Sequence, residues 1–303
     1  MKLKRNHVGI VLGALLALVA AELGLRVVDE GLPVGTDWPS IETDMKYHQL
    51  LGLPEADVVF LGSSITEAAV DPVEFAAISG TGTAFNSGIP FSTPFSNEFW
   101  LEQVVLPNVQ PDLVIIGLTA WSGGGSREND PLLLGLQAAM EAEGATSPFA
   151  LIEYAGVLSE WNSRSANDRV RDFLTDLGHQ TAYYERSIHD AAPLDLPFGP
   201  IDMPKEEIDA VQRMIDRLAV DDIEAMVYIE PGRYPGDNGT VDYDRYIDSI
   251  LEHSDDWGVP VIDSFHQDWE LSWFADLAHF NRQGTEAFTA YMARNVAKLT
   301  ASR

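Results

Sequence analysis

The sequence predicts an α/β fold, in which a parallel sheet of about five strands is covered by helices on both faces as a flavodoxin-like three-layer sandwich. Short apolar runs alternate with segments of helical spacing along the chain, which indicates strands joined by helices. The first run, "VVFL", is apolar throughout, as expected of a parallel strand buried on both faces. It passes straight into glycine and two serines. At such strand ends α/β sheets bind their ligands.

Five segments are the expected strands: "VVFL" from Val58, "GTAFNSG" ending at Gly88, "DLVIIGLTA" from Asp112, "DIEAMVYIEP" ending at Pro231 and "VPVIDSF" from Val259. Helices are expected after the first strand, at 97–106 and at 241–253. The last helix, "NRQGTEAFTAYMARNVAKL", places five large apolar residues on one face: Phe288, Tyr291, Met292, Val296 and Leu299. Residues 56–303 are therefore expected to form one domain.

Residues 123–220 interrupt the alternation of strands and helices. Their pattern is mostly helical, most clearly in "PKEEIDAVQRMIDRLA". We expect a helical insertion between the third and fourth strands, which forms either a cap over the active edge or a surface for a partner.

The amino terminus is expected to lie outside the globular domain. In residues 1–28, three basic side chains precede an apolar run from Val8 to Ala21, which is typical of an export signal or membrane anchor with its basic end in the cytoplasm. The run is short for a spanning helix, which needs ~20 residues, but it resumes after Glu22. We expect a retained signal-anchor, with a cleaved signal peptide as the alternative. Residues 29–55 then form a tether, and the domain lies outside the cytoplasm at the cell membrane, or is secreted if the signal is cleaved.

Composition excludes several kinds of function. The 303 residues include 47 acidic and 19 basic ones, for a net charge of -28, so nucleic acid is not an expected partner. The absence of cysteine excludes disulfides, thiolate metal sites, a cysteine nucleophile and a lipid-modified cysteine. Histidines are scattered without metal-ligand spacing, and "SGGGS" lacks the lysine of a phosphate-binding loop. We therefore expect neither a metal nor a cofactor.

The serines after the first strand have two readings. Ser63 or Ser64 could cap the following helix, or one of them could be a nucleophile. A serine nucleophile needs a base, and that base needs an acid that orients it. Asp276 and His279, three residues apart just before the last helix, supply both groups. Asp263 and His266 have the same spacing and are the alternative pair.

Three motifs carry a resemblance to a known family. "VVFLGSSITEAAVDP", "FNSGIP" and "DLAHFNRQG" resemble, in order, three blocks of the SGNH hydrolase superfamily, the GDSL-type esterases and lipases. The resemblance covers 56–121 and 223–299 and omits the insertion. It implies that Ser64 is the nucleophile of a Ser-His-Asp triad with His279 and Asp276. It also implies an oxyanion hole to which Ser64 and the backbone N–H of Gly88 contribute.

One block departs from the family. An asparagine normally follows the third strand and donates to the oxyanion, but here Thr119, Trp121 and Ser122 stand in that region. Asn129 lies further along the loop, where a surface role is the alternative. Asn86 is a substitute donor that could instead hold the turn. Losing one such donor costs about 3 to 4 kcal/mol of transition-state stabilisation.

Export, tether and triad together resemble the extracytoplasmic branch of the superfamily, which includes proteins that move acyl groups onto or off cell-surface polysaccharides. One hypothesis is an enzyme that hydrolyses or transfers O-acyl esters, with an acylated carbohydrate or small ester as substrate and the membrane contacted through the first helix. The other is a catalytically weak glycan-binding or accessory subunit of a membrane acyltransferase. Trp121 and Trp161 could stack on sugars or simply pack in the fold.

Overall fold

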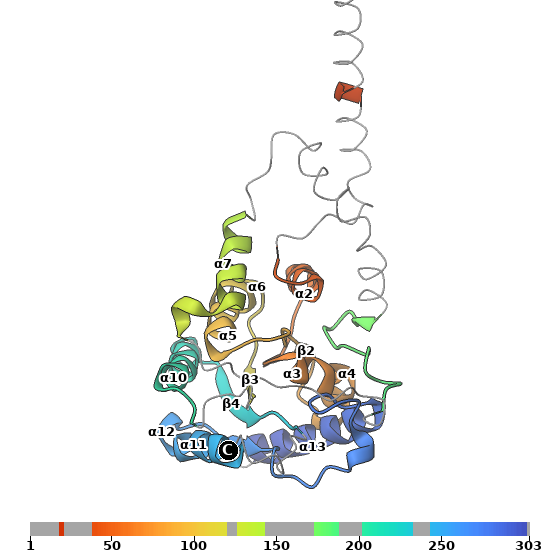
Figure 1. Cartoon of the computed structure of the whole chain (residues 1–303), viewed down its shortest axis with the longest axis vertical. Helices are drawn as coiled ribbons and strands as arrows, with labels where there is room; N and C mark the ends of the chain where they lie inside the picture. The colour runs from red at the N-terminus through yellow and green to blue at the C-terminus, as the bar shows by residue number, and fades with distance from the viewer. Residues whose placement is uncertain are drawn as a thin grey trace, which may run out of the picture.

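The computed structural model describes residues 18–20, 38–119, 126–142, 173–187, 202–232 and 243–301. Their centre is a five-stranded sheet (Figure 1) whose neighbouring strands are all parallel, in the order β2-β1-β3-β4-β5. The strands are β1 (Val58–Leu61), β2 (Ala84–Asn86), β3 (Leu113–Leu118), β4 (Glu224–Ile229) and β5 (Val261–Asp263). The predicted parallel α/β sheet is confirmed.

The strand order places the end of β1 at the point where the chain changes direction across the sheet. β2 pairs with one edge of β1 and β3 with the other, so that Val59 lies opposite both Phe85 and Val114. Such a switch point leaves a crevice at the carboxyl ends of the strands. The two serines that follow β1 therefore open into the expected ligand-binding edge.

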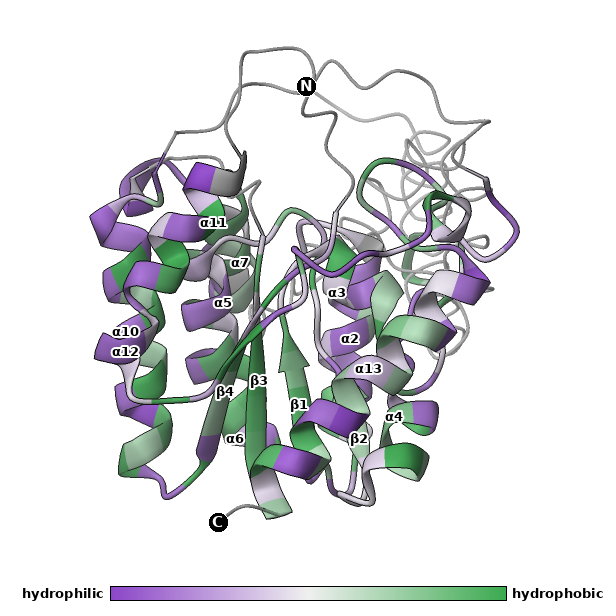
Figure 2. Ribbon diagram, turned by 90° about the horizontal axis from the view of Figure 1, so that it is seen from below, coloured by the Kyte–Doolittle hydropathy of each residue, from purple (hydrophilic) through white to green (hydrophobic). Residues whose placement is uncertain are grey.

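Helices cover both faces of the sheet, as Figure 2 shows. The helical elements are α2 (Ile41–Gly52), α3 (Ser64–Ala69), α4 (Pro72–Ser79), α5 (Pro94–Trp100), the π-helical turn η2 (Leu101–Val105), α6 (Leu106–Asn108), η3 (Arg127–Asn129), α7 (Pro131–Ala142), α10 (Lys205–Val220), α11 (Tyr243–Glu252), α12 (Ser254–Trp257), η7 (Leu271–Trp273) and α13 (Arg282–Ala301). The π-helical turn and α6 extend α5 directly.

Alternation along the strands divides the core into two layers. Val59 and Leu61 of β1 pack in one cluster with residues of α2, α5, α10 and α11. Val58 and Phe60 face the other way, into a cluster with residues of α4 and α13. The apolar face predicted for the last helix contributes Phe288 to this second cluster, and the three-layer arrangement is confirmed.

The described part of the predicted insertion does not form one compact unit. α10 packs on α5 and β4, and its buried Val211 and Leu218 belong to the main core. The segment 173–187 has little regular structure and is closed by a bridge between Leu174 and Gln180. The remaining residues of the insertion, with Trp161, lie outside the described part of the chain, and its boundaries stay a prediction.

The expected tether needs correction, because its second half is part of the domain. Residues 38–52 include α2, which Ser40 caps by accepting a hydrogen bond of 3.1 Å from Thr43 N. Trp38, Tyr47 and Leu50 are buried, and the Trp38 ring meets Trp100 edge-on at 5.5 Å. The helix was missed because its charged side chains hide a narrow apolar stripe, a pattern that resembles a solvated segment.

The predicted signal-anchor at 1–28 lies outside the described residues except for 18–20, and so does 29–37. In the part of the chain that the structure describes, no helix combines the length and the apolar character that crossing a membrane requires.

Candidate active site

The turn from β1 into α3 is built so that one serine points inward and the next faces a pocket. Gly62 has φ +153, and a Cβ there would collide with Thr66 Oγ1 and the Glu230 carboxylate. Ser63 caps α3, accepting a hydrogen bond of 3.1 Å from Ile65 N. Ser64 is the first residue of the helix and is partly exposed. The capping role expected of one of the two serines therefore falls to Ser63, while the Ser64 hydroxyl is not used as a cap.

Ser64, His279 and Asp276 lie in hydrogen-bonding sequence. His279 Nε2 lies 3.0 Å from Ser64 Oγ. On the other side of the ring, His279 Nδ1 lies 2.9 Å from Asp276 Oδ2. Asp276 Oδ1 also accepts a hydrogen bond of 2.8 Å from His279 N, which fixes the loop that carries both side chains. The structure thus brings together the three residues predicted from sequence.

The electrostatics favour one tautomer of His279. Burial by itself raises the pKa of Asp276, but the hydrogen bonds and charge of His279 outweigh it, so the pKa lies below its usual value. Asp276 is therefore a carboxylate at neutral pH and accepts a proton-bearing Nδ1. This leaves the lone pair of Nε2 facing Ser64 Oγ, the arrangement that a general base requires.

The alternative pair is intact but lies elsewhere. His266 Nδ1 is 2.7 Å from Asp263 Oδ2, immediately after β5. The histidine within hydrogen-bonding distance of Ser64 Oγ is His279, and it is His279 that lines the pocket beside this serine. Sequence spacing alone did not separate the two pairs.

A buried carboxylate that the sequence analysis missed holds the serine turn. Glu230 follows β4 and accepts hydrogen bonds from Ser63 N at 2.8 Å, from Ser63 Oγ at 2.6 Å and from Thr66 N at 3.3 Å. Thr66 Oγ1 donates to the same carboxylate and lies 2.5 Å from Tyr228 OH. The signal in the sequence was a glutamate that ends a buried strand, in "VYIEP".

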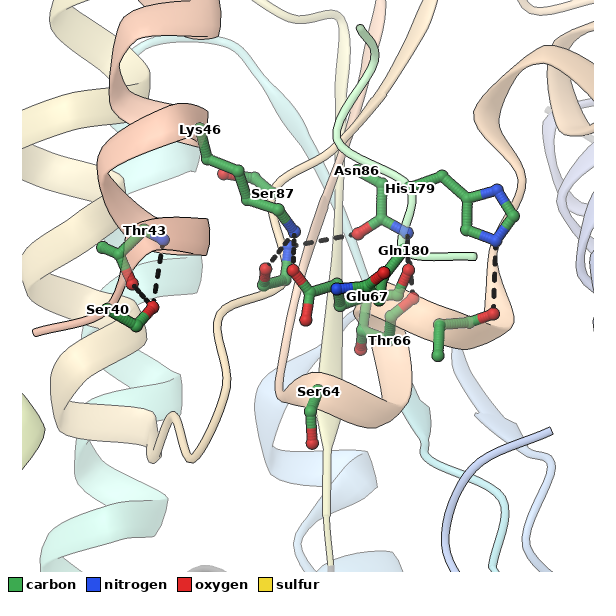
Figure 3. A network of polar contacts seen from close by, with 12 residues as sticks. Ser40, Thr43, Lys46, Ser64, Thr66, Glu67, Asn86, Ser87, His179 and Gln180 are labelled. Atoms are coloured by element: carbon green, nitrogen blue, oxygen red, sulfur yellow. Dashed lines mark hydrogen bonds and ion pairs between the residues drawn. The ribbon is translucent and has the colours of Figure 1, made fainter. Parts of the chain in front are cut away.

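Asn86 does not serve as an oxyanion donor in this structure, which corrects that prediction. Its Nδ2 donates to three carbonyl oxygens at the end of α3, those of Thr66, Glu67 and Val70, at 2.8 to 3.2 Å. Its Oδ1 accepts a hydrogen bond of 3.1 Å from Gly88 N. Asn86 therefore holds the turn, the alternative role, and Figure 3 shows its amide inside this network.

The other residues considered as oxyanion donors differ in whether their N–H groups are already hydrogen-bonded. The Gly88 N–H would have to leave Asn86 before it could bind an oxyanion. The Ser64 N–H has no acceptor among the described residues. Asn129 is exposed and donates to Ser126 Oγ at 2.9 Å, whereas Trp121 and Ser122 lie outside the described residues. Of Ser64, Asn86, Gly88 and Asn129, all of which the structure describes, only Ser64 lines the pocket, and its N–H has no acceptor among the described residues.

A buried ion pair lies behind the serine turn. Lys46 Nζ of α2 is 3.1 Å from Glu67 Oε1 of α3, and both side chains are buried. Lys46 also donates to the Gly88 carbonyl. Burial raises the pKa of Glu67 and lowers that of Lys46. Figure 3 shows the pair in the network, while the Ser64 hydroxyl points away from it.

A pocket of about 450 Å³ opens over Ser64 and His279. Its walls come from four parts of the chain: Glu42 of α2, Glu67 of α3, Pro90 and Phe91 after β2, and Phe173, Gln180, Ala182, Tyr183 and Arg186 of the segment 173–187. Phe91 has a left-handed backbone, with φ 62, and its side chain is 88% exposed. Among the described residues, no cluster of histidine and acidic side chains could hold a metal ion.

Comparisons with known proteins find structural likeness without sequence relatives. No protein-family model matches the chain, and no curated protein matches it. It is similar to the structure of a GDSL-like lipase from Bacteroides thetaiotaomicron, at 12% identity and a TM-score of 0.44, over 86% of this chain and 100% of that one.

Two further structures are similar at the same level. One is an acetyl xylan esterase, at 15% identity and a TM-score of 0.41, over 80% of this chain and 98% of that one. The other is an alpha/beta hydrolase enzyme from the metagenome of Lake Arreo, Spain, at 14% identity and a TM-score of 0.44, over 80% and 95% of the two chains. Because these scores lie below 0.5, the chemistry of the site has to be argued from its own side chains.

Proposed function

We propose that this chain is an SGNH-type serine enzyme that cleaves O-acyl esters through an acyl-serine intermediate. The observation that carries the proposal is the hydrogen-bonded sequence Ser64, His279 and Asp276 at the floor of a pocket. A serine hydroxyl is a weak nucleophile until a positioned base takes its proton. Here the base is 3.0 Å away, within the distance that proton transfer requires.

The proposed reaction has two halves. Ser64 Oγ attacks the ester carbonyl while His279 Nε2 takes its proton, and Asp276 stabilises the imidazolium that forms. The imidazolium then returns the proton to the leaving alkoxide, and the acyl-serine remains. In the second half, His279 deprotonates a water or a sugar hydroxyl, which attacks the acyl-serine and frees Ser64. The net reaction is hydrolysis in the first case and acyl transfer in the second.

The N–H of Ser64 is the donor that we assign to the oxyanion. It lies at the start of α3 and has no acceptor among the described residues. Asn86 is committed to the end of α3, and the Gly88 N–H to Asn86. An oxyanion hole with few free donors stabilises the transition state weakly, which supports slow turnover of small activated esters.

The test is labelling of the full chain with a fluorophosphonate, which reacts with activated serines. Ser64→Ala and His279→Ala should abolish labelling, while Ser63→Ala and His266→Ala should keep most of it. Asp276→Asn should fold and react far more slowly, because His279 loses the acceptor that orients it. Labelling that survives Ser64→Ala but is lost in Ser63→Ala would show that the nucleophile is Ser63 and that the assignment to Ser64 is wrong.

A second candidate is a catalytically weak glycan-binding or accessory subunit of a membrane acyltransferase. It is favoured by the engagement of both Asn86 and the Gly88 N–H in structural hydrogen bonds. Absence of serine labelling, together with binding of an acylated glycan to the purified chain, would support it over the enzyme.

For substrate and location, we propose an acylated carbohydrate met outside the cytoplasm. The basic start and apolar run at 1–28 support export and a membrane tether. A tethered enzyme holds a polymer acceptor near the acyl-serine, which favours transfer over hydrolysis. A reporter that is active only after export, fused at the carboxyl end, tests the location. Rapid turnover of nitrophenyl acetate with no effect of added glycan would contradict transfer and leave a simple esterase.

A further inference from the structure

The ring of Tyr183 lies flat on the imidazole of His279. The two ring centroids are 4.1 Å apart and the planes differ by 6°. Tyr183 belongs to the segment 173–187, within the predicted insertion, and is half-buried in the wall of the pocket. A part of the chain that carries none of the three family motifs therefore touches the proposed base directly.

The side chain of Arg186 contacts the same ring. The Arg186 guanidinium lies over Tyr183, 4.9 Å from the ring centroid. The face of an aromatic ring is electron-rich and attracts cations. Tyr183 thus contacts both a permanent cation and the group that becomes a cation when Ser64 loses its proton.

The segment that carries Tyr183 is fixed at both sides of the site. Gln180 N donates to the Glu67 carbonyl of α3 at 3.0 Å. Beyond Tyr183, Arg282 N donates to the Tyr184 carbonyl at 3.3 Å, and the Arg282 guanidinium lies 4.4 Å from the centre of the Tyr184 ring. The stack on His279 is therefore held by two backbone hydrogen bonds, one to α3 and one to the start of α13, and neither involves the Tyr184 side chain.

We propose that Tyr183 is a positioning residue for His279, which sets the plane of the imidazole and stabilises its protonated form through the ring face. The proposal rests on the proposed function of the triad. A ring stacked on one face leaves Nδ1 and Nε2 free in the plane for Asp276 and Ser64. It also stabilises the imidazolium more than the neutral imidazole, which favours proton transfer from Ser64.

Other charges also act on His279 and have to be kept constant in a test. Asp276 faces it from its own loop, Glu67 from α3, Glu42 from α2 and Arg186 from beyond Tyr183. None of these is altered by substitution of Tyr183 with an uncharged residue. A difference between an aromatic and an aliphatic residue at this position therefore isolates the effect of the ring.

The experiment compares Tyr183→Phe with Tyr183→Leu in the full chain. An NMR titration measures the pKa of the His279 imidazole, and the rate of fluorophosphonate labelling measures the reactivity of Ser64. Phenylalanine keeps the ring, and leucine keeps only apolar bulk. We expect Tyr183→Phe to stay within about twofold of the wild type in labelling rate. Tyr183→Leu should destabilise the imidazolium of His279, lowering its titration midpoint relative to the wild type, and slow labelling roughly three- to tenfold.

Tyr184→Leu is the matched control, since Tyr184 lies in the same segment and stacks on Arg282 rather than on His279. It should leave the His279 pKa unchanged. The proposal is overturned if Tyr183→Leu leaves the pKa and the labelling rate unchanged, or if Tyr183→Phe is impaired as much as Tyr183→Leu. A wild-type chain that is not labelled at all contradicts the proposed function instead, and the titration still shows whether the ring stabilises the imidazolium.

Discussion

Ser63 Oγ donates a hydrogen bond of 2.6 Å to Glu230 Oε2, which directs this serine into the core while its neighbour Ser64 faces the pocket. The same carboxylate accepts the backbone N–H of Ser63 at 2.8 Å. Glu230 thus joins the end of β4 to the turn after β1. Of the two adjacent serines, Ser63 holds the turn and Ser64 presents its side chain to the pocket.

This division of roles predicts opposite effects of two alanine substitutions. Ser63→Ala removes the cap of α3 and one donor to a buried carboxylate, which should lower the free energy of unfolding by about 1 to 3 kcal/mol. Labelling of Ser64 should persist. Ser64→Ala should change stability little and abolish labelling. Urea unfolding and fluorophosphonate labelling measure the two properties, and a stability loss confined to Ser64→Ala would contradict the assignment.

The buried ion pair between Lys46 and Glu67 predicts a large effect of breaking it. Lys46→Met leaves the Glu67 carboxylate buried without its cation, which should cost about 3 to 5 kcal/mol at neutral pH. The double variant Lys46→Met, Glu67→Leu should be clearly more stable than Lys46→Met alone, since no charge is then buried. Chemical unfolding of the three proteins measures the difference.

The control for that experiment is the exposed pair of Lys205 and Asp209 on α10. Lys205→Met should have almost no effect on stability, because water screens a surface pair. If Lys46→Met is equally harmless, α2 does not depend on the pair for its place in the core.

His179 predicts a dependence of stability on pH. Burial lowers the pKa of its imidazole to about 4, although Asp71 acts in the opposite direction. The unfolded chain binds this proton near pH 6.5, so the neutral, folded form is favoured above that pH. This stability is lost as pH falls from about 6.5 towards 4, and the loss amounts to about 3 kcal/mol.

His179→Gln should therefore lose less stability than the wild type between pH 7 and about pH 4. Urea unfolding across that range measures the two slopes. The exposed His48, on α2, supplies the control, and His48→Gln should follow the wild-type slope. Identical slopes for wild type and His179→Gln would show that His179 does not titrate with a lowered pKa in the folded chain.

The strands could be predicted from the sequence because most of them are short, largely apolar runs bounded by breakers. The motif positions led to Ser64, Asp276 and His279, and in the structure the His279 side chain lies within hydrogen-bonding distance of the other two. The sequence was insufficient where a role depends on a distant partner. Glu230 bonds Ser63, 167 positions away, and no local pattern marks that contact. Lys46 was assigned to the tether because a lysine among charged residues in the sequence resembles a surface residue. Its buried partner, Glu67, becomes visible only in the folded chain.

The role of Asn86 could not be predicted from the sequence either. Its position two residues before Gly88, in the second motif, suggested an oxyanion donor. A helix of six residues, however, ends within reach and leaves carbonyl oxygens that need donors. The side-chain amide satisfies three of them. Which of two polar tasks an asparagine performs is decided by the backbone around it, and that backbone is known only from the fold.

Phe91 predicts that stability and substrate binding will change in opposite directions. Its left-handed backbone, with φ 62, is unfavourable for a bulky residue, and 88% of the side chain is exposed at the rim of the pocket. Asparagine tolerates this conformation. Phe91→Asn should thus raise the free energy of unfolding by up to about 1 kcal/mol, while an ester substrate loses an aromatic surface and its KM rises.

Phe91→Leu separates the two effects, because leucine keeps a bulky apolar residue in the left-handed conformation but removes the ring. It should raise KM as Phe91→Asn does, without the gain in stability. Urea unfolding gives the stabilities, and initial rates with an acylated sugar give KM and kcat. A kcat that is unchanged while KM rises would locate Phe91 in substrate binding, since only interactions that differ between bound substrate and transition state alter kcat. An unchanged KM in both variants would mean that the substrate does not pass over this ring.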